Sequence, residues 1–598
     1  MDPGNWATDL EGGARFGYSL LWVLVASNLV ALLLQTLASR LGIVTRLDLA
    51  QACRDEYPRA VSYVLWVLGE IAIVACDLAE VLGAAIGLNL LFHIPLLTGV
   101  LLTAADTLLI LWFTRLGIRF IEAFVLALIA VIAVCFGFEI AFAHPDTTAI
   151  LSGLLPRLDS KNLYIAVGIF GATVMPHNLY LHSALVQTRR IGNSISDKRQ
   201  ACRFNLVDSA VALNGALFVN AAILIMSAAV FFRRGIIVTE IQQAHQLLAP
   251  LLGTTLASVL FGLALLCSGQ SSTLTGTMAG QIVMEGFLRF RMQPWLRRTI
   301  TRFLAITPAA LTIYFAGEQG SYRLLILSQV ILSLQLPFVV IPLVHFTSSR
   351  KRMGSFANGP AVRSLAWLSA AVILALNIWL LRDKAVEWIE SAPGHWRVWV
   401  RLGVAASGMA FGALLFLIVA WPRLRARWPG LPEPESQPVA VTVPVPGPPL
   451  KPPIQAQGVY SRILVPLDHS EADEEALQAA LMLAKLHDAK ILLLHVEEGV
   501  TSFLFGSLSS TAEIAEGQAY LSQVADSLRE QKVEVEVAVR HGKSPAKEIT
   551  AAVRELAPDL VVMASHGHRG WKDLVFGTTI NAVRHRISVP LLIVGSGR

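Results

Sequence analysis

Eleven long apolar segments constrain this chain more than any other feature of its sequence. A helix needs ~20 apolar residues to cross the hydrocarbon core of a bilayer. Only 15% of the 598 residues are charged, against about 25% in an average soluble protein. We therefore predict a polytopic α-helical membrane protein embedded in the lipid bilayer. The segments lie near 18–38, 61–90, 94–112, 120–143, 163–186, 206–232, 255–283, 300–316, 323–346, 364–381 and 399–420.

The loops between these segments alternate between rich and poor in arginine and lysine. The basic loops lie near 40–59, 115–119, 189–203, 289–298, 350–363 and 423–427. By the positive-inside rule, these loops face the cytoplasm, and so does the C-terminal part of the chain. The net charge of +6 is spread over loops and is not gathered on a soluble domain, so we expect no nucleic-acid partner.

Two apolar segments are interrupted by proline next to side chains that can bind a metal ion. The first break is Asp2-Pro3-Gly4-Asn5 and the second is Met175-Pro176-His177. In transporters built from inverted repeats, such interrupted helices mark the substrate site near the bilayer midplane. Irregular backbone at that depth is tolerated where it is buried in protein or lines a cavity. A carboxylate, an amide oxygen and a thioether together suit a divalent transition metal.

Several ionisable residues lie inside the apolar segments, where they are costly and indicate function. Asp77 and Glu80 share one helix face through their i, i+3 spacing, and two carboxylates at one depth favour a proton or cation path. His177 and His182 flank the second break. His182 has two open readings, a hydrogen-bonded interior histidine and a member of the proton path.

The first 420 or so residues resemble the Nramp family of proton-coupled divalent metal transporters, which have a LeuT-type fold with inverted repeats of five helices. The resemblance implies that Asp2, Asn5 and Met175 bind the metal through their side chains. It also implies that the Ala172 carbonyl binds it in one state and Gln329 in another. The motifs that carry it are Asp2-Pro3-Gly4-Asn5, Asp77-Leu78-Ala79-Glu80-Val81-Leu82-Gly83, Met175-Pro176-His177-Asn178-Leu179-Tyr180-Leu181-His182-Ser183, Ser268-Gly269-Gln270-Ser271-Ser272 and Ser328-Gln329-Val330.

The same resemblance implies a proton path through Asp2, His177, Asp77 and Glu80, with Arg302 as a later member. A thioether contributes little to Mg²⁺ or Ca²⁺ and suits Mn²⁺, Fe²⁺ and Co²⁺ better; the sequence leaves the choice among these three open. We therefore expect a transporter and not an enzyme, with Mn²⁺ or Fe²⁺ and protons as its substrates.

Two features depart from the family pattern. Cys76 stands where members usually have threonine, directly before the Asp77 motif. The chain also begins at the metal site, whereas the family has half a helix and a cytoplasmic tail before this aspartate. We therefore expect the first half-helix to be missing from this sequence and to be encoded upstream.

The composition changes after Trp421. Eleven prolines between 422 and 453 predict an extended linker, which could reach on the order of 80 Å at about 3 Å per residue. We expect a transporter domain over 1–421, a linker over 422–458 and a soluble domain over 459–598.

The soluble part alternates short apolar strands with helices, which predicts a doubly wound parallel α/β sheet. Predicted strands lie at 462–467, 490–496, 533–540, 559–564 and 590–594, and predicted helices at 471–487, 511–531, 545–556 and 577–587. A glycine-containing loop follows the fourth strand, and backbone N–H groups at the start of the next helix can hold phosphate.

About 140 residues of this part resemble the universal stress protein family, through Ile463-Leu464-Val465-Pro466-Leu467-Asp468 and the segment from Val561 to Thr578. The resemblance implies that ATP or a related adenine nucleotide binds here and that the domain forms homodimers. Asp468 would contact the ribose, Val496 and Met563 the adenine, and the glycine loop the phosphates. The implied nucleotide site comprises Pro466, Asp468, Val496, Met563, Gly567, Gly570, Gly577 and Thr578.

The leading hypothesis is therefore a proton-coupled Mn²⁺/Fe²⁺ importer of a bacterial inner membrane with a cytoplasmic nucleotide-binding regulatory domain. Two alternatives remain. One is an Na⁺-coupled organic-solute symporter, which Met175 and the paired acids disfavour. The other is a membrane-tethered stress sensor with an inactive transporter domain.

Overall fold

The computed structural model describes residues 2–105, 118–188, 191–192, 194–238, 241–288, 294–393, 396–427, 460–469, 472–497, 512–542, 544–565, 579–584 and 586–595. The chain divides into two compact units, which are described separately. One takes in most of Met1–Pro434 and the other most of Glu435–Arg598. The predicted linker lies largely outside the described residues, and its bounds stay a prediction.

The described residues of the first unit form helices joined by short irregular connections. Nine of its helical stretches are long and apolar enough to cross a membrane, in agreement with the prediction of a polytopic membrane protein. Its helices are α1 (Pro3–Phe16), α2 (Leu21–Thr45), α3 (Leu49–Glu56), α4 (Arg59–Phe92), α5 (Leu96–Leu102), α7 (Ile118–Ala143), α8 (Thr147–Gly153), α9 (Leu163–Val174), α10 (Pro176–Leu185), α11 (Ile195–Val230), α12 (Ile241–Leu252), α13 (Thr255–Leu288), α14 (Pro294–Ser348), α15 (Arg350–Met353), α16 (Pro360–Ser391) and α17 (Arg397–Arg427).

Eleven spans were predicted and nine are found among the described residues. Two of the predicted spans account for this difference. The segment 94–112 lies partly outside the described residues, and 163–186 is divided into α9 and α10 at Met175. The predicted spans 300–316 and 323–346 both belong to α14, which bends at Gly317, where φ is 65°. Only glycine adopts this backbone region readily, so the bend lies where the sequence permits it.

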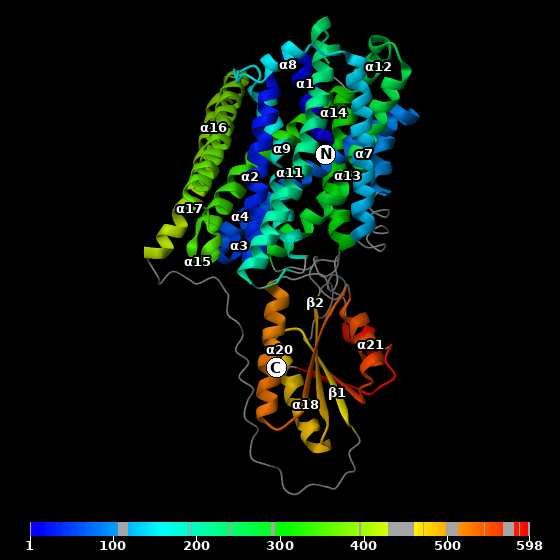
Figure 1. The fold of residues 1–598 in the computed structure, drawn as a ribbon, viewed down its shortest axis with the longest axis vertical. Helices are drawn as coiled ribbons and strands as arrows, with labels where there is room; N and C mark the ends of the chain where they lie inside the picture. The colour runs from blue at the N-terminus through cyan, green and yellow to red at the C-terminus, as the bar shows by residue number, and fades with distance from the viewer. Residues whose placement is uncertain are drawn as a thin grey trace. The chain divides into compact units, whose positions relative to one another are not determined.

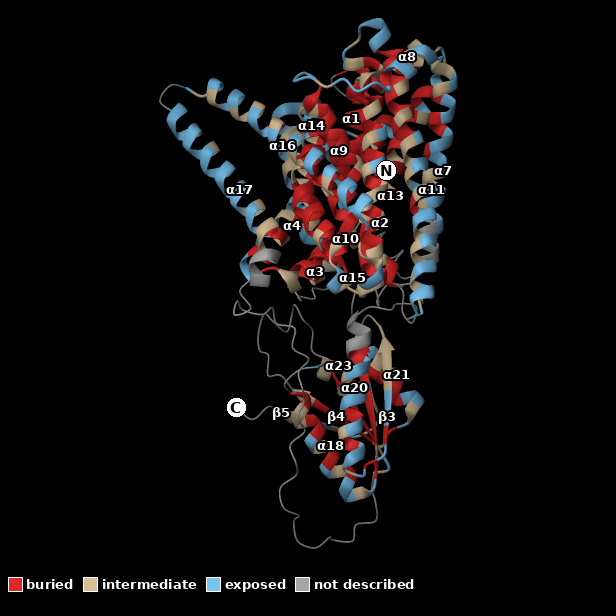
Figure 2. Ribbon diagram, turned by 60° about the vertical axis from the view of Figure 1, so that its left-hand side comes forward, coloured by how far each residue is buried: buried red, intermediate tan, exposed pale blue. Residues whose placement is uncertain are grey.

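The interior of the helical unit is formed by helices that pack closely through small residues. α4 packs against α13 and α14, and α1 packs against α11, α9 and α14 (Figure 1). A Cβ atom on Gly269 of α13 would come within 3.0 Å of the Ala84 backbone nitrogen of α4, the close approach that small residues permit in membrane bundles. Buried residues gather on α1, α9, α10 and α13, whereas α17 is largely exposed (Figure 2), as expected of a lipid-facing helix.

The second unit is a five-stranded parallel sheet covered by helices on both faces. The strand order is β3-β2-β1-β4-β5, which confirms the predicted doubly wound α/β fold. The strands are β1 (Arg462–Leu467), β2 (Lys490–Glu497), β3 (Val535–His541), β4 (Leu560–Ser565) and β5 (Leu591–Gly595), and the helices are α18 (Asp473–His487), α20 (Ala512–Glu530), α21 (Pro545–Leu556) and α23 (Thr579–Arg584).

Alternation along the strands gives this unit two apolar cores of its own. Ile463 and Val465 of β1 belong to a core with α18 and α20, and Leu464 belongs to one with α21 and α23, because successive side chains of a strand point to opposite faces. The chain builds β2 and β3 on one side of β1 and then β4 and β5 on the other. The carboxyl ends of β1 and β4 therefore flank a topological switch point, where ligands of such sheets bind.

Candidate metal and proton sites

The first predicted break places two oxygen donors inside the helical unit. Asp2 has an extended backbone, with φ −104° and ψ 142°, and Pro3 occupies the first position of α1, where its missing N–H costs nothing. Asp2 is 1% exposed and Asn5 is 3% exposed. The Asp2 Oδ1 and Asn5 Oδ1 atoms have no hydrogen-bond partner among the described residues, although buried oxygens are nearly always paired.

The second predicted break separates α9 from α10 at Met175. Its φ of 47° is uncommon for a residue with a side chain. Pro176 has no N–H, so the Ala172 carbonyl, four residues earlier, lacks its usual helical donor. The Met175 sulfur accepts a hydrogen bond from the Asn178 side-chain nitrogen at 3.0 Å. A carbonyl oxygen and a thioether are thus both present at the break.

Gln329 of α14 brings the two breaks together. Its Nε2 donates to Asp2 Oδ2 at 3.2 Å. A Cβ atom on Gly4 would lie 1.7 Å from that nitrogen, and one on Gly171 would lie 2.1 Å from the Gln329 carbonyl oxygen. Glycine at both positions is therefore what allows α1 and α9 to approach this residue. Gln329 is fully buried, and its Oε1 atom also lacks a partner among the described residues.

The predicted ligands are distributed over three helices that meet at Gln329, and their joint binding of a metal stays a prediction. Asp2 contacts Gln329 directly, Ala172 follows Gly171 in the chain, and Asn5 and Met175 lie in the two breaks. No cluster of three or more His, Cys, Asp and Glu side chains suited to a metal occurs among the described residues. The predicted metal ligands include a single residue of those four types, Asp2.

Three of the predicted proton residues, Asp77, Glu80 and Arg302, form a largely buried electrostatic group beside the predicted metal site. Arg302 Nη1 of α14 pairs with Asp77 Oδ1 of α4 at 2.5 Å, and its Nε donates to the Thr103 carbonyl at 3.3 Å. Glu80 is 1% exposed and interacts electrostatically with Asp77, Asp2 and Arg302. Glu80, three residues after Asp77, thus interacts with both Asp77 and the Asp2 carboxylate.

The two histidines have different surroundings. His177 is 4% exposed, and its Nε2 lies 3.6 Å from the Cys76 sulfur, which in turn donates to Glu80 Oε1 at 3.5 Å. His182 lies 2.7 Å from Gln35 Oε1 of α2 through Nδ1 and 3.2 Å from Asn205 Oδ1 of α11 through Nε2. These contacts fit an interior, hydrogen-bonded histidine, and its place in the proton path stays a prediction.

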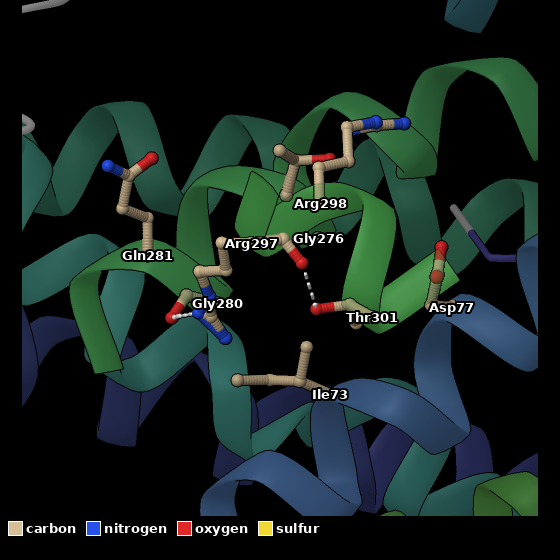
Figure 3. Close-up of a pocket in the computed structure, with 9 residues that line it drawn as sticks. Ile73, Asp77, Gly276, Gly280, Gln281, Arg297, Arg298 and Thr301 are labelled. Carbon is tan, nitrogen blue, oxygen red and sulfur yellow. Dashed lines mark hydrogen bonds between the residues drawn. The ribbon is translucent and has the colours of Figure 1, made fainter. Parts of the chain in front are cut away.

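Sequence reasoning missed a second, partly buried ion pair next to this group. Arg297 Nη2 pairs with Glu70 Oε2 at 2.8 Å, and Arg297 Nη1 donates to the Gly280 carbonyl (Figure 3). The signal was present, because Glu70 lies seven residues before Asp77 and hence on the same face of α4. The pair borders a pocket lined by Ile73, Asp77, Gly276, Thr277, Gly280, Gln281, Arg297, Arg298 and Thr301.

The structure describes half of the predicted nucleotide site. Asp468 is exposed at the carboxyl end of β1, and Pro466 is partly buried within the strand. Val496 and Met563 are buried on the sheet face that α21 covers. Gly567, Gly570, Gly577 and Thr578 lie outside the described residues.

A buried acid lies directly behind Asp468. Asp473 opens α18 and accepts hydrogen bonds from the N–H groups of Asp468 and His469, at 3.2 and 2.8 Å, and from the Tyr520 hydroxyl at 3.1 Å. The His469 ring lies between those of His495 and Tyr520, with centroids 4.4 and 4.2 Å away. Burial, followed by the negative charge of Asp468, raises the pKa of Asp473 to about 7.

We expect the α/β unit to lose stability as the pH rises from about 4 to about 7. The pKa of Asp473 rises on folding from its ordinary 3.8 to about 7, so the folded state binds more protons in this window and the free energy of unfolding falls, by on the order of 2 kcal/mol. Thermal unfolding of residues 460–598 at pH 5 and pH 8 measures this. Asp473→Asn should flatten the dependence, and the exposed Asp526→Asn should keep it. Equal slopes for Asp473→Asn and the parent would contradict the assignment.

Comparison with known proteins identifies both units. The model of the family described as natural resistance-associated macrophage protein-like, Nramp, matches residues 1–383, and that of the universal stress protein family matches residues 460–595. The divalent metal cation transporter MntH of Nostoc sp. is 57% identical over 398 residues, which cover 66% of this chain and 90% of that protein. MntH of Agrobacterium fabrum is 56% identical over 388 residues, with 64% and 84% covered.

A solved structure agrees with these matches. The Eremococcus coleocola manganese transporter in complex with an aromatic bis-isothiourea substituted compound is 38% identical, with a TM-score of 0.66, and the match covers 71% of this chain and 92% of that one. Because the family model spans more than half of the chain, and the relatives are matched over most of their length, the chain belongs to the Nramp family of transporters and carries a C-terminal universal stress protein domain.

Proposed function

We propose that this chain is a divalent metal transporter that imports Mn²⁺ or Fe²⁺ together with protons. One observation carries the proposal. The Asp2 Oδ1, Asn5 Oδ1 and Gln329 Oε1 atoms are buried and none of them has a hydrogen-bond partner among the described residues, while Gln329 Nε2 contacts the other oxygen of Asp2. An unsatisfied buried acceptor costs about 1–3 kcal/mol, and a cation bound by these oxygens would remove that cost.

The donor types argue for a transition metal. Three oxygens alone would also suit Ca²⁺ or Mg²⁺, which prefer oxygen ligands. The Met175 thioether at the second break adds a softer donor, which favours Mn²⁺, Fe²⁺ and Co²⁺. The same sulfur argues against an Na⁺-coupled organic-solute symporter.

Proton coupling is supported by the position of the acids. Glu80 interacts electrostatically with both Asp2 and Asp77. A cation bound at Asp2 would therefore change the proton affinity of Glu80 without contacting it. The Arg302 partner of Asp77 is 2% exposed, and the Asp77 side chain keeps 14% exposure at the edge of the ion pair. We propose Asp2, His177, Asp77, Glu80 and Arg302 as the path, in a bacterial plasma membrane.

Metal uptake by the purified full-length protein in proteoliposomes tests this function. With an acidic exterior, we expect Mn²⁺ uptake to exceed that without a gradient, and an internal pH dye should report proton entry that depends on Mn²⁺. Uptake driven by Na⁺ and indifferent to pH would overturn the coupling. Loss of all divalent metal uptake would favour the alternative of a tethered sensor with an inactive transporter domain.

We further propose that the C-terminal domain is cytoplasmic, forms homodimers, binds an adenine nucleotide and regulates transport. Its cytoplasmic placement is supported by the basic segments of the transporter domain, the last of which, 423–427, lies at the end of α17. Nucleotide binding is supported by the switch point between β1 and β4, beside which Asp468 is exposed. The adenine would contact Val496 and Met563.

We expect residues 460–598, which have apolar cores on both faces of the sheet, to bind a fluorescent ATP analogue. Asp468→Ala should weaken binding at least about tenfold through loss of the ribose contact, since a buried or charge-assisted hydrogen bond is worth about 1.5–3 kcal/mol. Replacing Gly570 or Gly577 with leucine should abolish binding, because a side chain blocks close approach of the backbone. Asp526→Ala, on an exposed helix end, is the control.

Regulation has its own test in the full chain. Deleting 430–598 should preserve basal Mn²⁺ uptake, because every proposed metal ligand precedes the linker. Any change in uptake rate caused by adenine nucleotide should vanish in the deletion. If neither the isolated domain nor the full chain binds an adenine nucleotide, the domain is better explained as a dimerisation module.

A further inference from the structure

The Cys76 thiol lies between two side chains of the helical interior. Its sulfur is 3.6 Å from His177 Nε2 and 3.5 Å from Glu80 Oε1. Cys76 is 3% exposed and His177 is 4% exposed. The thiol comes from α4 and the imidazole from α10, so their approach depends on how these two helices pack.

The separation of the sulfur and the nitrogen matches a shared metal ion. A tetrahedral Zn²⁺ holds thiolate sulfur at about 2.3 Å and imidazole nitrogen at about 2.0–2.1 Å, which places the two ligand atoms about 3.5–3.6 Å apart. The observed 3.6 Å is therefore compatible with a bridging cation without movement of either helix. Glu80 already accepts a hydrogen bond from the thiol, so the thiol proton has an acceptor when the sulfur binds as a thiolate.

Two further observations indicate a cation at this place. The Nδ1 atom of the buried His177 has no hydrogen-bond partner among the described residues, so the contact with Cys76 is the polar contact that orients the ring. The carboxylates of Asp2, Glu80 and Asp77 all interact electrostatically with the Cys76 thiol. Asp77 is paired with Arg302, so the attraction for a divalent cation comes chiefly from the Asp2 and Glu80 carboxylates.

We propose that Cys76 and His177 form a thiolate–imidazole pair that captures a thiophilic divalent cation, with Zn²⁺ as the probe, beside the transport ligands. This pair differs from the site at the two breaks, where the sulfur donor is the Met175 thioether. A cation bound to a thiolate dissociates slowly. Its positive charge would also act on the nearby Asp2 and Glu80 carboxylates and oppose the arrival of Mn²⁺ at Asp2. The pair therefore makes Zn²⁺ an inhibitor of Mn²⁺ uptake.

Co²⁺ titration of the detergent-solubilised full-length protein tests the pair without any transport. We expect a sulfur-to-cobalt charge-transfer band in the near ultraviolet, which a thioether does not produce with comparable intensity, and Zn²⁺ should displace it. Cys76→Ser should abolish the band, and His177→Gln should weaken Co²⁺ affinity. The matched control is Cys53→Ser, at another fully buried cysteine, which should keep the band. A band that persists in Cys76→Ser would overturn the proposal.

Inhibition of Mn²⁺ uptake is the second test, and this arm alone rests on the proposed transport function. Each variant is compared with its own uptake in the absence of Zn²⁺. Cys76→Ser should raise the half-inhibitory Zn²⁺ concentration at least about tenfold. Substitution of a residue that only supports a ligand lowers metal affinity about 10–100-fold, and loss of the ligand itself should lower it at least as much. Cys53→Ser should leave the half-inhibitory concentration unchanged. Unaltered inhibition in Cys76→Ser would refute the inhibitory role. Absence of Mn²⁺ uptake by the parent would refute the transport function and leave the cobalt result standing.

Discussion

Met175→Ala is expected to admit Ca²⁺ and Mg²⁺ and to lose most Cd²⁺ binding while some Mn²⁺ transport remains. The substitution removes the soft sulfur donor, whereas the oxygens of Asp2, Asn5 and Gln329 stay in place. Hard cations such as Ca²⁺ and Mg²⁺ prefer the oxygen ligands that remain. Cd²⁺ is a soft cation and loses the Met175 sulfur, which contributes most to its binding. A fall in Cd²⁺ affinity of at least about tenfold is expected, since even outer-shell substitutions cost about 10–100-fold.

Isothermal titration with Cd²⁺ and competition of Mn²⁺ uptake by Ca²⁺ measure this change. Met175→Leu is the matched variant, because it removes the sulfur but conserves the volume at the break. The two variants should agree in metal preference. If Ca²⁺ stays excluded as strongly as in the parent, the thioether does not set selectivity. If alanine and leucine differ widely, the cause is packing at the break and not the loss of the donor.

Asp77→Asn and Glu80→Gln are expected to reduce metal-stimulated proton flux far more than metal binding. Both acids belong to α4, and the proposed ligands belong to α1, α9 and α14, so the substitutions should leave the metal ligands in place. Asp77→Asn has an added cost, because it leaves the buried Arg302 without its carboxylate, and removing one partner of a buried pair costs about 3–5 kcal/mol of stability. Glu80→Gln keeps the shape of the side chain and is the cleaner variant.

Calorimetry and a pH-dye assay on the same preparation separate binding from proton flux. Glu390→Gln, at an exposed glutamate near the end of α16, is the control and should resemble the parent in both. Thermal unfolding shows whether Asp77→Asn remains folded before its flux is compared. Equal loss of metal binding and proton flux in Glu80→Gln would place this residue in the metal site.

The secondary structure follows closely from local pattern in both units. β1 was predicted at 462–467 and observed at Arg462–Leu467, and α21 was predicted at 545–556 and observed at Pro545–Leu556. Buried parallel strands are short apolar runs between helices, and proline opens α21 as it does many helices. The break at Met175 was equally visible, because proline inside an apolar helix removes a donor wherever the helix lies.

Local sequence pattern could not predict which residues the buried polar side chains contact. Gln329 was predicted as a ligand through resemblance, but its place between Gly4 and Gly171 depends on the packing of α14 against α1 and α9. The Glu70–Arg297 pair joins α4 to α14 across 227 residues of sequence, so the spacing of Glu70 from Asp77 indicates its face of the helix but not its partner. His182 shows the same limit, since its contacts with Gln35 and Asn205 come from two other helices.

Composition, periodicity and motif order were sufficient for the number and type of the two units, their family and the residue types that can bind a metal. These properties depend on short-range physics: the length of an apolar run, the alternation of a strand and the donor that a proline lacks. The tertiary structure alone decided which donors meet, because that depends on how closely glycine-bearing helices approach. It placed Asp2 against Gln329, Asp77 against Arg302 and Cys76 against His177, and the proposed cation and proton sites rest on these contacts.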